Sequence, residues 1–146
     1  MATPIEQQWL YESIVEQSSD AIIHADREGI IRLWNPAAEA MFGFSAREAL
    51  DKPLDLIIPE NLRARHWDGF HRVMKTGETK YATGCLSAPG QKKDGTRISL
   101  EFSMSMVRNA SGEAVGCTAI LRDVTARWQK DKELRNRVKE LEEKLK

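Results

Sequence analysis

Residues 96–108 read TRISLEFSMSMVR, and they alternate polar and apolar side chains almost without a fault. The apolar side of this stretch consists of Ile98, Leu100, Phe102, Met104 and Met106. Because successive side chains of a strand point to opposite faces, the stretch predicts a strand with one dry face. Turn-forming sequences flank it, KKDGT at 92–96 and NASGE at 109–113. We therefore expect residues 79–90, 96–108 and 114–124 to form an antiparallel meander.

The chain before the meander combines a hairpin with short helices. Residues 20–35, DAIIHADREGIIRLWN, are two apolar runs around a glycine-containing turn and predict the hairpin. Asn35 followed by Pro36 is a strong helix start, since an N-cap side chain precedes the helical position where proline costs little. Ser45 with Glu48 predicts a capping box for a second helix. A third helix is expected from about residue 60 to 76, ended by Gly77.

Both ends of the chain are expected to carry flanking helices. Residues 5–17 show an imperfect helical pattern, which suits a short helix docked on a larger body. Near the other end the apolar spacings alternate between four and three residues, as in a coiled-coil seam, at Leu134, Val138, Leu141 and Leu145. A seam of this length is marginal in water, so we expect it to pair with a second copy or to continue into a further segment.

The composition predicts one domain with an appendage, because 146 residues suffice for a single core of ordinary size. The 22 basic side chains balance the 22 acidic ones, so nothing points to nucleic acid or an anionic membrane. The first 20 residues lack the pattern of a secretory signal, and no stretch approaches the roughly 20 apolar residues that span a bilayer. Cys85 and Cys117 stand alone and are expected to be small core residues, although they could approach each other across the sheet. A reduced, cytoplasmic setting follows as the expectation.

One histidine lies on the apolar stripe of the third helix. The stripe has spacings of four, four and three residues and consists of Leu62, His66, Phe70 and Val73. Arg63, Arg65 and Asp68 lie off the stripe, so His66 is predicted to point inward, with Gly69 leaving room beside it. The dry face of residues 98–106 would form the opposite wall, which suits an apolar macrocycle better than a sugar or nucleotide. Neutral imidazole is a common axial ligand of haem iron.

In both residues and element order, the chain resembles a PAS domain over about residues 18–125. The resemblance rests on GIIRLWNPAAEAMFGFSAREALDKPLDLIIPE (29–60), KKDGTRISLEFSM (92–104) and GCTAILRDVTARW (116–128), in which Asp123 and Thr125 match the Asp-x-Thr that ends the last PAS strand. It implies an α+β fold, a five-stranded antiparallel sheet with short helices on one face. It also implies a sensor flanked by an N-terminal helix at 1–17 and a C-terminal signalling helix at 126–146. PAS domains hold haem, flavins, small acids or nothing, so the fold alone does not name the ligand.

The segment LRARHWDGFHRVMKTGETKYATGCLSAPGQKKDG, residues 62–95, resembles the haem-PAS segment of rhizobial oxygen-sensor kinases and bacterial direct-oxygen-sensor phosphodiesterases. The resemblance implies that His66 is the proximal ligand of haem b. It places basic residues near the haem propionates, Arg72 and Lys80, and apolar residues over the distal face, Tyr81, Phe102 and Met104. Leu100 belongs to the same expected wall, and Met104 is a candidate sixth ligand.

Two differences from these sensors bear on which diatomic gas the haem would bind. Leu86 stands where the rhizobial sensors carry the arginine that hydrogen-bonds oxygen, and Gly84 stands where the phosphodiesterases carry a distal methionine. Without a distal donor, carbon monoxide or nitric oxide would be favoured relative to oxygen, unless Tyr81 turns inward. A gas or redox sensor is therefore expected, with the sensed molecule left open.

Three other functions stay open at this point. NLRARHWDGF at 61–70 lacks the cysteine motif of the light-sensing flavin branch, but a non-covalent flavin or a small apolar metabolite could stack on Trp34 or Trp67. The domain could also be a ligand-free dimerisation module. An enzyme is the poorest interpretation, because His24 and His71 have no nucleophile or carboxylate at a meaningful spacing. We expect a homodimer through the terminal helices, with neither nucleic acid nor membrane as partner.

Overall fold

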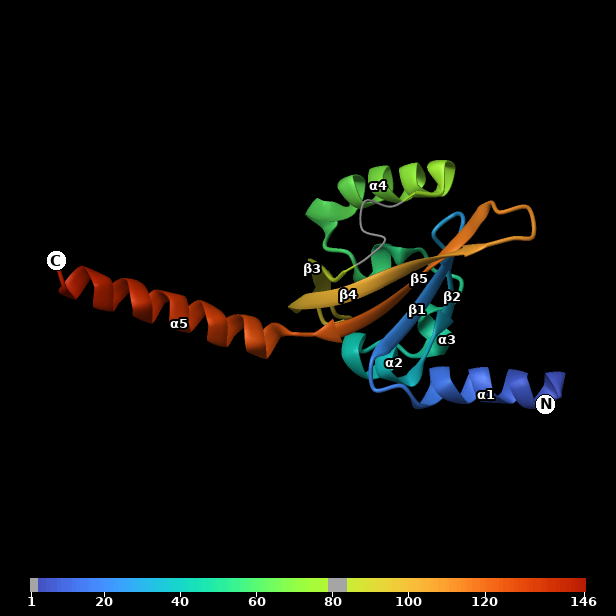
Figure 1. Cartoon of the computed structure of the whole chain (residues 1–146), viewed down its shortest axis with the longest axis horizontal. Coiled ribbons are helices and arrows are strands. Elements are labelled where there is room, and N and C mark those ends of the chain that lie inside the picture. Colours follow the sequence, from blue (N-terminus) through green and yellow to red (C-terminus); the bar gives the residue numbers. More distant parts are fainter. Residues whose placement is uncertain (1–2, 79–83) are drawn as a thin grey trace.

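A five-stranded antiparallel sheet forms the centre of the computed structural model, which describes residues 3–78 and 84–146. The strands lie in the order β2-β1-β5-β4-β3, and their bounds are Ala21–Asp26 for β1, Ile31–Trp34 for β2, Leu86–Gln91 for β3, Arg97–Arg108 for β4 and Ala114–Asp123 for β5. The first hairpin pairs with β5, so the two halves of the chain share one sheet (Figure 1). The expected α+β fold is confirmed.

The helices follow the predicted caps closely. Their bounds are Pro4–Gln17 for α1, Pro36–Phe42 for α2, Ala46–Ala49 for α3, Arg63–Thr76 for α4 and Thr125–Lys144 for α5, with two short 3-10 turns, Leu54–Ile57 (η1) and Glu60–Leu62 (η2). The Asn35 side chain caps α2, and Ser45 with Glu48 forms the predicted capping box of α3. Gly77 ends α4 in the left-handed region, which glycine enters without strain.

One predicted boundary was refined and another was wrong. The third helix was expected from about residue 60, and the helical segment does begin there, as the 3-10 turn η2 at 60–62 that leads directly into α4 at Arg63. A meander strand was expected at 79–90, but residues 84 and 85 are not in the sheet and β3 runs from Leu86 to Gln91. Residues 79–83 lie outside the described part of the chain. The strand predicted at 96–108 is confirmed as β4.

The core occupies one face of the sheet. Inward side chains of three strands, Ile23, Leu100 and Leu121, pack in one cluster with residues of α2, α3 and η1. A second, smaller cluster joins Phe70 and Met74 of α4 to Cys117 of β5. The short helices and α4 therefore cover the same face, as expected for this fold.

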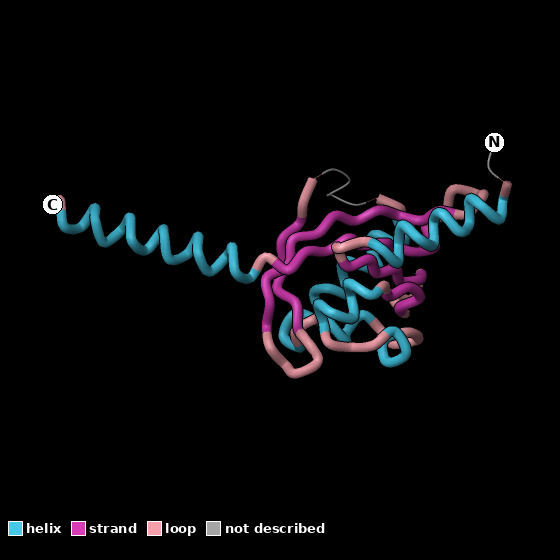
Figure 2. Tube along the Cα trace, turned by 90° about the horizontal axis from the view of Figure 1, so that it is seen from below, coloured by secondary structure: helices cyan, strands magenta, loops and turns pink. Residues whose placement is uncertain are grey.

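The two terminal helices lie outside this core. None of the residues of α1 or α5 is buried in the described structure. Figures 1 and 2 both show α5 projecting from the body with no other element beside it. Among the described residues, no helix combines the length and apolar character needed to cross a bilayer.

The two cysteines differ from each other. Cys117 is buried as predicted, but the prediction of a core position for Cys85 was wrong, because it is exposed just before β3 begins. Both are free thiols.

Candidate functional site

A cavity of about 330 Å³ lies between α4 and the inner face of the sheet. Its walls come from α4, η1 and four of the strands, β1, β3, β4 and β5. This volume is at the lower end of the range of about 300–1,000 Å³ that small-molecule sites occupy. Nearly all lining side chains are apolar, and those that carry nitrogen or a thiol are Arg65, His66 and Cys117. The cavity is therefore a candidate site for a mainly apolar ligand.

His66 lines this cavity from α4, so the predicted inward orientation is confirmed. Its Nδ1 atom is buried and finds no hydrogen-bond partner among the described residues. Burial lowers the pKa of His66 below its ordinary value, against an opposing effect of the nearby Asp55 carboxylate. The side chain is thus a neutral imidazole at neutral pH, and a neutral ring nitrogen can bind a metal ion.

Several contacts hold α4 in the orientation that turns His66 inward. The indole Nε1 of Trp67 donates a hydrogen bond to Asp55 Oδ1 of η1 at 2.7 Å. The guanidinium Nε of Arg63 donates to the carbonyl of Ile58 at 3.0 Å. Trp67 also lies against Gly29, where a Cβ atom would come within 2.3 Å of the indole ring. These contacts fix the first turns of α4 on the loops beneath it.

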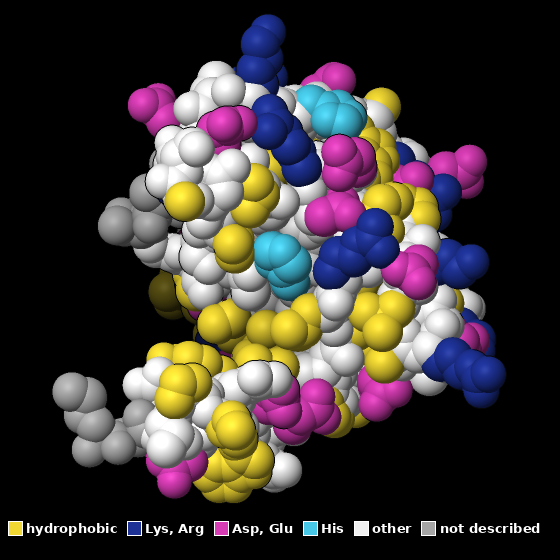
Figure 3. Space-filling view, turned by 90° about the vertical axis from the view of Figure 1, so that its right-hand side faces the viewer, with side chains coloured by type: hydrophobic (Ala, Val, Ile, Leu, Met, Phe, Trp, Pro, Cys, Tyr) yellow, Lys and Arg dark blue, Asp and Glu magenta, His cyan; other side chains and the backbone are white. Residues whose placement is uncertain are grey.

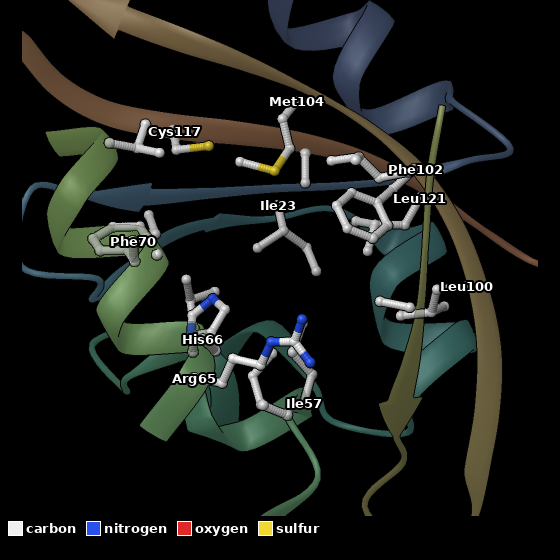
Figure 4. A pocket seen from close by; sticks show the side chains of 18 of the residues that line it. Ile23, Ile57, Arg65, His66, Phe70, Leu100, Phe102, Met104, Cys117 and Leu121 are labelled. Carbon is white, nitrogen blue, oxygen red and sulfur yellow. The ribbon is translucent and has the colours of Figure 1, made fainter. Parts of the chain in front are cut away.

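The wall opposite His66 is formed by side chains of β4 and β5. Figure 4 shows Met104, Cys117 and Phe102 across the cavity from His66. Burial raises the pKa of the Cys117 thiol to about 11, so it stays protonated at neutral pH and is a poor metal ligand in that form. Met104 offers an uncharged thioether on the same wall. The wall is therefore apolar and carries only weakly polar sulfur groups.

Gly69 gives the cavity part of its space. It lines the cavity on α4, and a Cβ atom built there would have no other side chain within 4 Å. A glycine in a helix interior costs about 1 kcal/mol relative to alanine, so the open volume beside it is obtained at the expense of helix stability.

The structure brings most of the sequence-predicted residues together at the cavity. Six of them line it, namely His66, Gly69, Leu86, Leu100, Phe102 and Met104. Arg72 does not, because it is exposed and lies about 1.7 helical turns beyond His66, on a different side of α4. Lys80 and Tyr81 lie outside the described residues. Gly84 is exposed and is not part of the lining.

The two tryptophans considered as stacking groups do not line the cavity. Trp34 is buried in the main core, where its Nε1 donates a hydrogen bond to the carbonyl of Phe44 at 2.9 Å. Trp67 is engaged with Asp55. Both indoles therefore have structural roles in this conformation.

Sequence reasoning missed Arg65 and Cys117. Arg65 was placed off the apolar stripe of α4, yet its side chain reaches the cavity beside His66 (Figure 4). Its position four residues before Gly69 was an available signal, because residues four apart share a helix face. Cys117 was taken only as core, although the alternation along 114–123 puts it on the same sheet face as Leu121.

Comparisons with known proteins agree with this architecture. The chain is 31% identical over 129 residues to the sensor protein FixL of Bradyrhizobium diazoefficiens, which covers 88% of this chain and 25% of FixL. It is 26% identical over 121 residues to the oxygen sensor protein DosP of Escherichia coli, with 83% of this chain and 15% of DosP covered. The chain thus spans a quarter or less of the length of these relatives.

Solved structures show the same fold at low identity. The PAS domain of a protein from Colwellia psychrerythraea superposes with a TM-score of 0.69 at 20% identity, covering 82% of this chain and 98% of that one. An RNA-binding light-oxygen-voltage receptor gives a TM-score of 0.78 at 21% identity, with 95% and 39% covered. The family profile described as PAS fold matches residues 15–129. The chain therefore belongs to the PAS family, and it is a sensory signalling domain of that fold.

Proposed function

We propose that the domain binds haem b through His66, senses a diatomic gas or a redox change, and passes the signal on through α5. The observation that carries the proposal is a neutral imidazole on the wall of an apolar cavity, with a buried Nδ1 that lacks a partner among the described residues. A buried unpaired polar atom costs free energy, so a ligand that bonds to this nitrogen would relieve a cost present without it.

The resemblance to haem-PAS segments at residues 62–95 supports the same ligand. One of the relatives, DosP, is named an oxygen sensor. The cavity and His66 carry the proposal, and this resemblance agrees with them.

The residues present fit a haem in four respects. His66 would hold the iron, and Gly69 leaves space next to it. Leu100 and Phe102 would exclude water from the cavity, and Met104 is our second proposed ligand. Haem supplies an iron centre that binds diatomic gases and exchanges an electron.

The facing wall bears on which gas is sensed. Leu86 of β3 lines the cavity, and among the described lining residues the wall of β4 and β5 carries no hydrogen-bond donor stronger than the Cys117 thiol. Oxygen gains more from a distal donor than carbon monoxide does. We therefore propose carbon monoxide, nitric oxide or the redox state of iron in preference to stable oxygen binding.

Absorption spectroscopy of the purified protein after reconstitution tests the ligand. A Soret band supports haem, whereas the absorption of an oxidised flavin would support the alternative that a light-oxygen-voltage structural neighbour suggests. If the protein binds neither chromophore after exposure to haem and flavin, the remaining alternatives are a small apolar metabolite as ligand or a ligand-free dimerisation module. His66 variants, treated in the Discussion, connect the band to this cavity.

The variant Gly69→Ala is expected to change stability and haem affinity in opposite directions. Without haem, the free energy of unfolding should rise by up to about 1 kcal/mol, because alanine favours a helix interior and its methyl group meets no side chain. The same methyl group occupies space at the cavity wall, so haem affinity should fall about tenfold. Urea unfolding and haem titration measure the two effects.

The control is Ala64→Gly on the exposed side of the same helix. It should lower stability by about 1 kcal/mol and leave haem affinity unchanged. If Gly69→Ala binds haem as well as the parent, the space beside Gly69 is not part of the haem site.

Strand β4 connects the cavity to α5, and this supports the route of the signal. Its inward residues line the cavity, while the residues between them contact the start of α5. The Ser99 amide donates to Thr125 Oγ1 at 2.9 Å, and Ser99 accepts from the Val124 amide at 2.9 Å. The Glu101 carboxylate pairs with Arg127. A ligand that shifts β4 therefore moves groups bonded directly to the beginning of α5.

Hydrogen exchange measures this coupling. Signalling needs two states that the ligand binds unequally, so haem should change the exchange of amides in residues 125–146. Identical exchange of this helix with and without haem would contradict transmission through α5. His66→Ala treated with haem is the matched control, in which no change is expected.

We further propose a homodimer through the terminal helices. Three seam residues of α5, Leu134, Val138 and Leu141, are about half exposed, and Leu145, just beyond α5, is 88% exposed. Five apolar side chains of α1 are also exposed, namely Ile5, Trp9, Leu10, Tyr11 and Ile14. Figure 3 shows hydrophobic side chains gathered on the end of the molecule where α1 lies. Such surface is covered when two copies pair. A monomer in sedimentation at concentrations where haem is bound would argue against this assembly.

The remaining assignments are proposals of the same kind. We divide the chain into a flanking helix at 1–17, the sensor at 18–125 and the signalling helix at 126–146, in a cytoplasmic setting. We propose no catalytic activity for the domain itself. His24 lies on the outer face of the sheet, where its Nδ1 is 2.8 Å from Thr118 Oγ1, and His71 is exposed and stacked on Trp67.

A further inference from the structure

Arg65 brings a cation to a cavity that is otherwise nearly apolar. It is the one Lys or Arg side chain among the described lining residues. In Figure 4 its guanidinium reaches past His66 toward Ile57, on the side of the cavity formed by α4 and η1. The residue as a whole is exposed, so the guanidinium lies at the rim, where the stem covers apolar surface and the charge stays near water.

The charge of Arg65 has no partner within the described part of the chain. Arg65 makes no hydrogen bond or ion pair with any residue in 3–78 or 84–146, whereas the neighbouring Arg63 donates to the Ile58 carbonyl. The Asp55 carboxylate is close enough to affect the pKa of His66. Its Oδ1, however, already accepts the hydrogen bond of the Trp67 indole. The rim of the cavity thus carries a positive charge without a negative one to match it.

We infer that the cavity takes an amphiphilic ligand with an apolar body and a carboxylate, and that Arg65 pairs with this carboxylate at the rim. The guanidinium presents a planar pair of donors that matches a carboxylate, and a bidentate pair of this kind fixes orientation as well as adding affinity. The body of the ligand would lie against Leu100, Phe102 and Met104, with its acid group directed outward.

This inference deepens the proposed function, because it takes the same cavity as the ligand site. A haem propionate satisfies it, and so does the acid group of a fatty acid. It also assigns the carboxylate to a cation other than the two implied by the family resemblance, of which Arg72 lies off the cavity and Lys80 lies outside the described residues. Arg65 would be a specificity-determining residue, which selects the acid over its neutral ester.

The test compares ferric protoporphyrin IX with its dimethyl ester on the full chain. The variants are Arg65→Met, which keeps an unbranched stem, Arg72→Met, and Arg47→Met in α3 as a control for net charge. The parent protein should bind the free acid about five- to tenfold more tightly than the ester. Arg65→Met should lose this preference and bind the ester as the parent does, while the other two variants should retain it.

Each outcome bears on the inference or on the proposed function separately. A Soret band with an undiminished acid preference in Arg65→Met overturns the inference and leaves haem binding intact. If the protein changes the Soret band of neither porphyrin, haem binding fails, and dodecanoate is titrated against its methyl ester by tryptophan fluorescence. An acid preference that Arg65→Met removes then supports the inference with a fatty acid as source, and no binding of either lipid overturns it.

Discussion

Asn35→Ala is expected to lower the free energy of unfolding by about 4 kcal/mol. The Asn35 side chain is 1% exposed and uses all of its principal hydrogen-bonding positions. Its Oδ1 accepts from the amides of Ile22 at 2.8 Å and Ala38 at 3.1 Å. Its Nδ2 donates to the carbonyls of Val15 at 3.0 Å and Asp20 at 3.1 Å. Alanine would leave four backbone groups without this partner, and each costs about 1 kcal/mol.

Ser45→Ala is the matched control for this loss. Ser45 is also a helix N-cap, but its bonds join only α3 to itself and are open to solvent, so about 1 kcal/mol is expected. Urea unfolding gives both values from the midpoints if the slopes agree. A loss for Asn35→Ala no greater than that for Ser45→Ala would show that Asn35 acts as a cap alone and does not bind α1, β1 and α2 together.

Local patterns predicted the elements that depend on neighbouring residues. The alternation in 96–108 gave β4, and the Asn35-Pro36 step gave the start of α2, because each depends on groups close in sequence. The bond from Asn35 to Val15 spans 20 residues and could not be read from a helix cap. The sequence pattern therefore predicted that Asn35 caps α2, but it did not predict the bonds that join Asn35 to α1 and β1.

Positions that depend on side-chain reach were not predictable in the same way. The spacing of four between Arg65 and Gly69 places both residues on one side of α4, but only the structure shows that the long stem of Arg65 reaches the cavity. Cys85 was expected in a strand, yet the strand begins one residue later, and the thiol is exposed. Pairing with β4 decides where β3 begins, and single-strand patterns do not contain that information.

His66→Ala is expected to abolish the Soret absorption of the reconstituted protein. Removal of the imidazole takes away the proposed iron ligand, and the described part of the cavity offers only the thioethers of Met74 and Met104 and the protonated Cys117 thiol in its place. Free imidazole added to the variant should restore the band, because the vacated volume admits the lost ring. The fold should be retained, since Nδ1 of His66 makes no hydrogen bond to a described residue whose loss would unfold α4.

His71→Ala provides the control on the same helix. His71 follows Phe70 on the exposed side of α4 and is not part of the cavity lining. If haem uptake depended only on the number of histidines, the bands of His66→Ala and His71→Ala would be reduced equally. If His66 is the ligand, only the band of His66→Ala is lost.

The most direct test of the central claim is therefore one titration of haem into the parent, His66→Ala and His71→Ala proteins, followed by Soret absorption. The parent and His71→Ala should give the same saturable shift and sharpening of the Soret band relative to free haem, and His66→Ala should keep the spectrum of free haem until imidazole is added. A His66→Ala protein that binds haem with the affinity and spectrum of the parent would contradict the central claim.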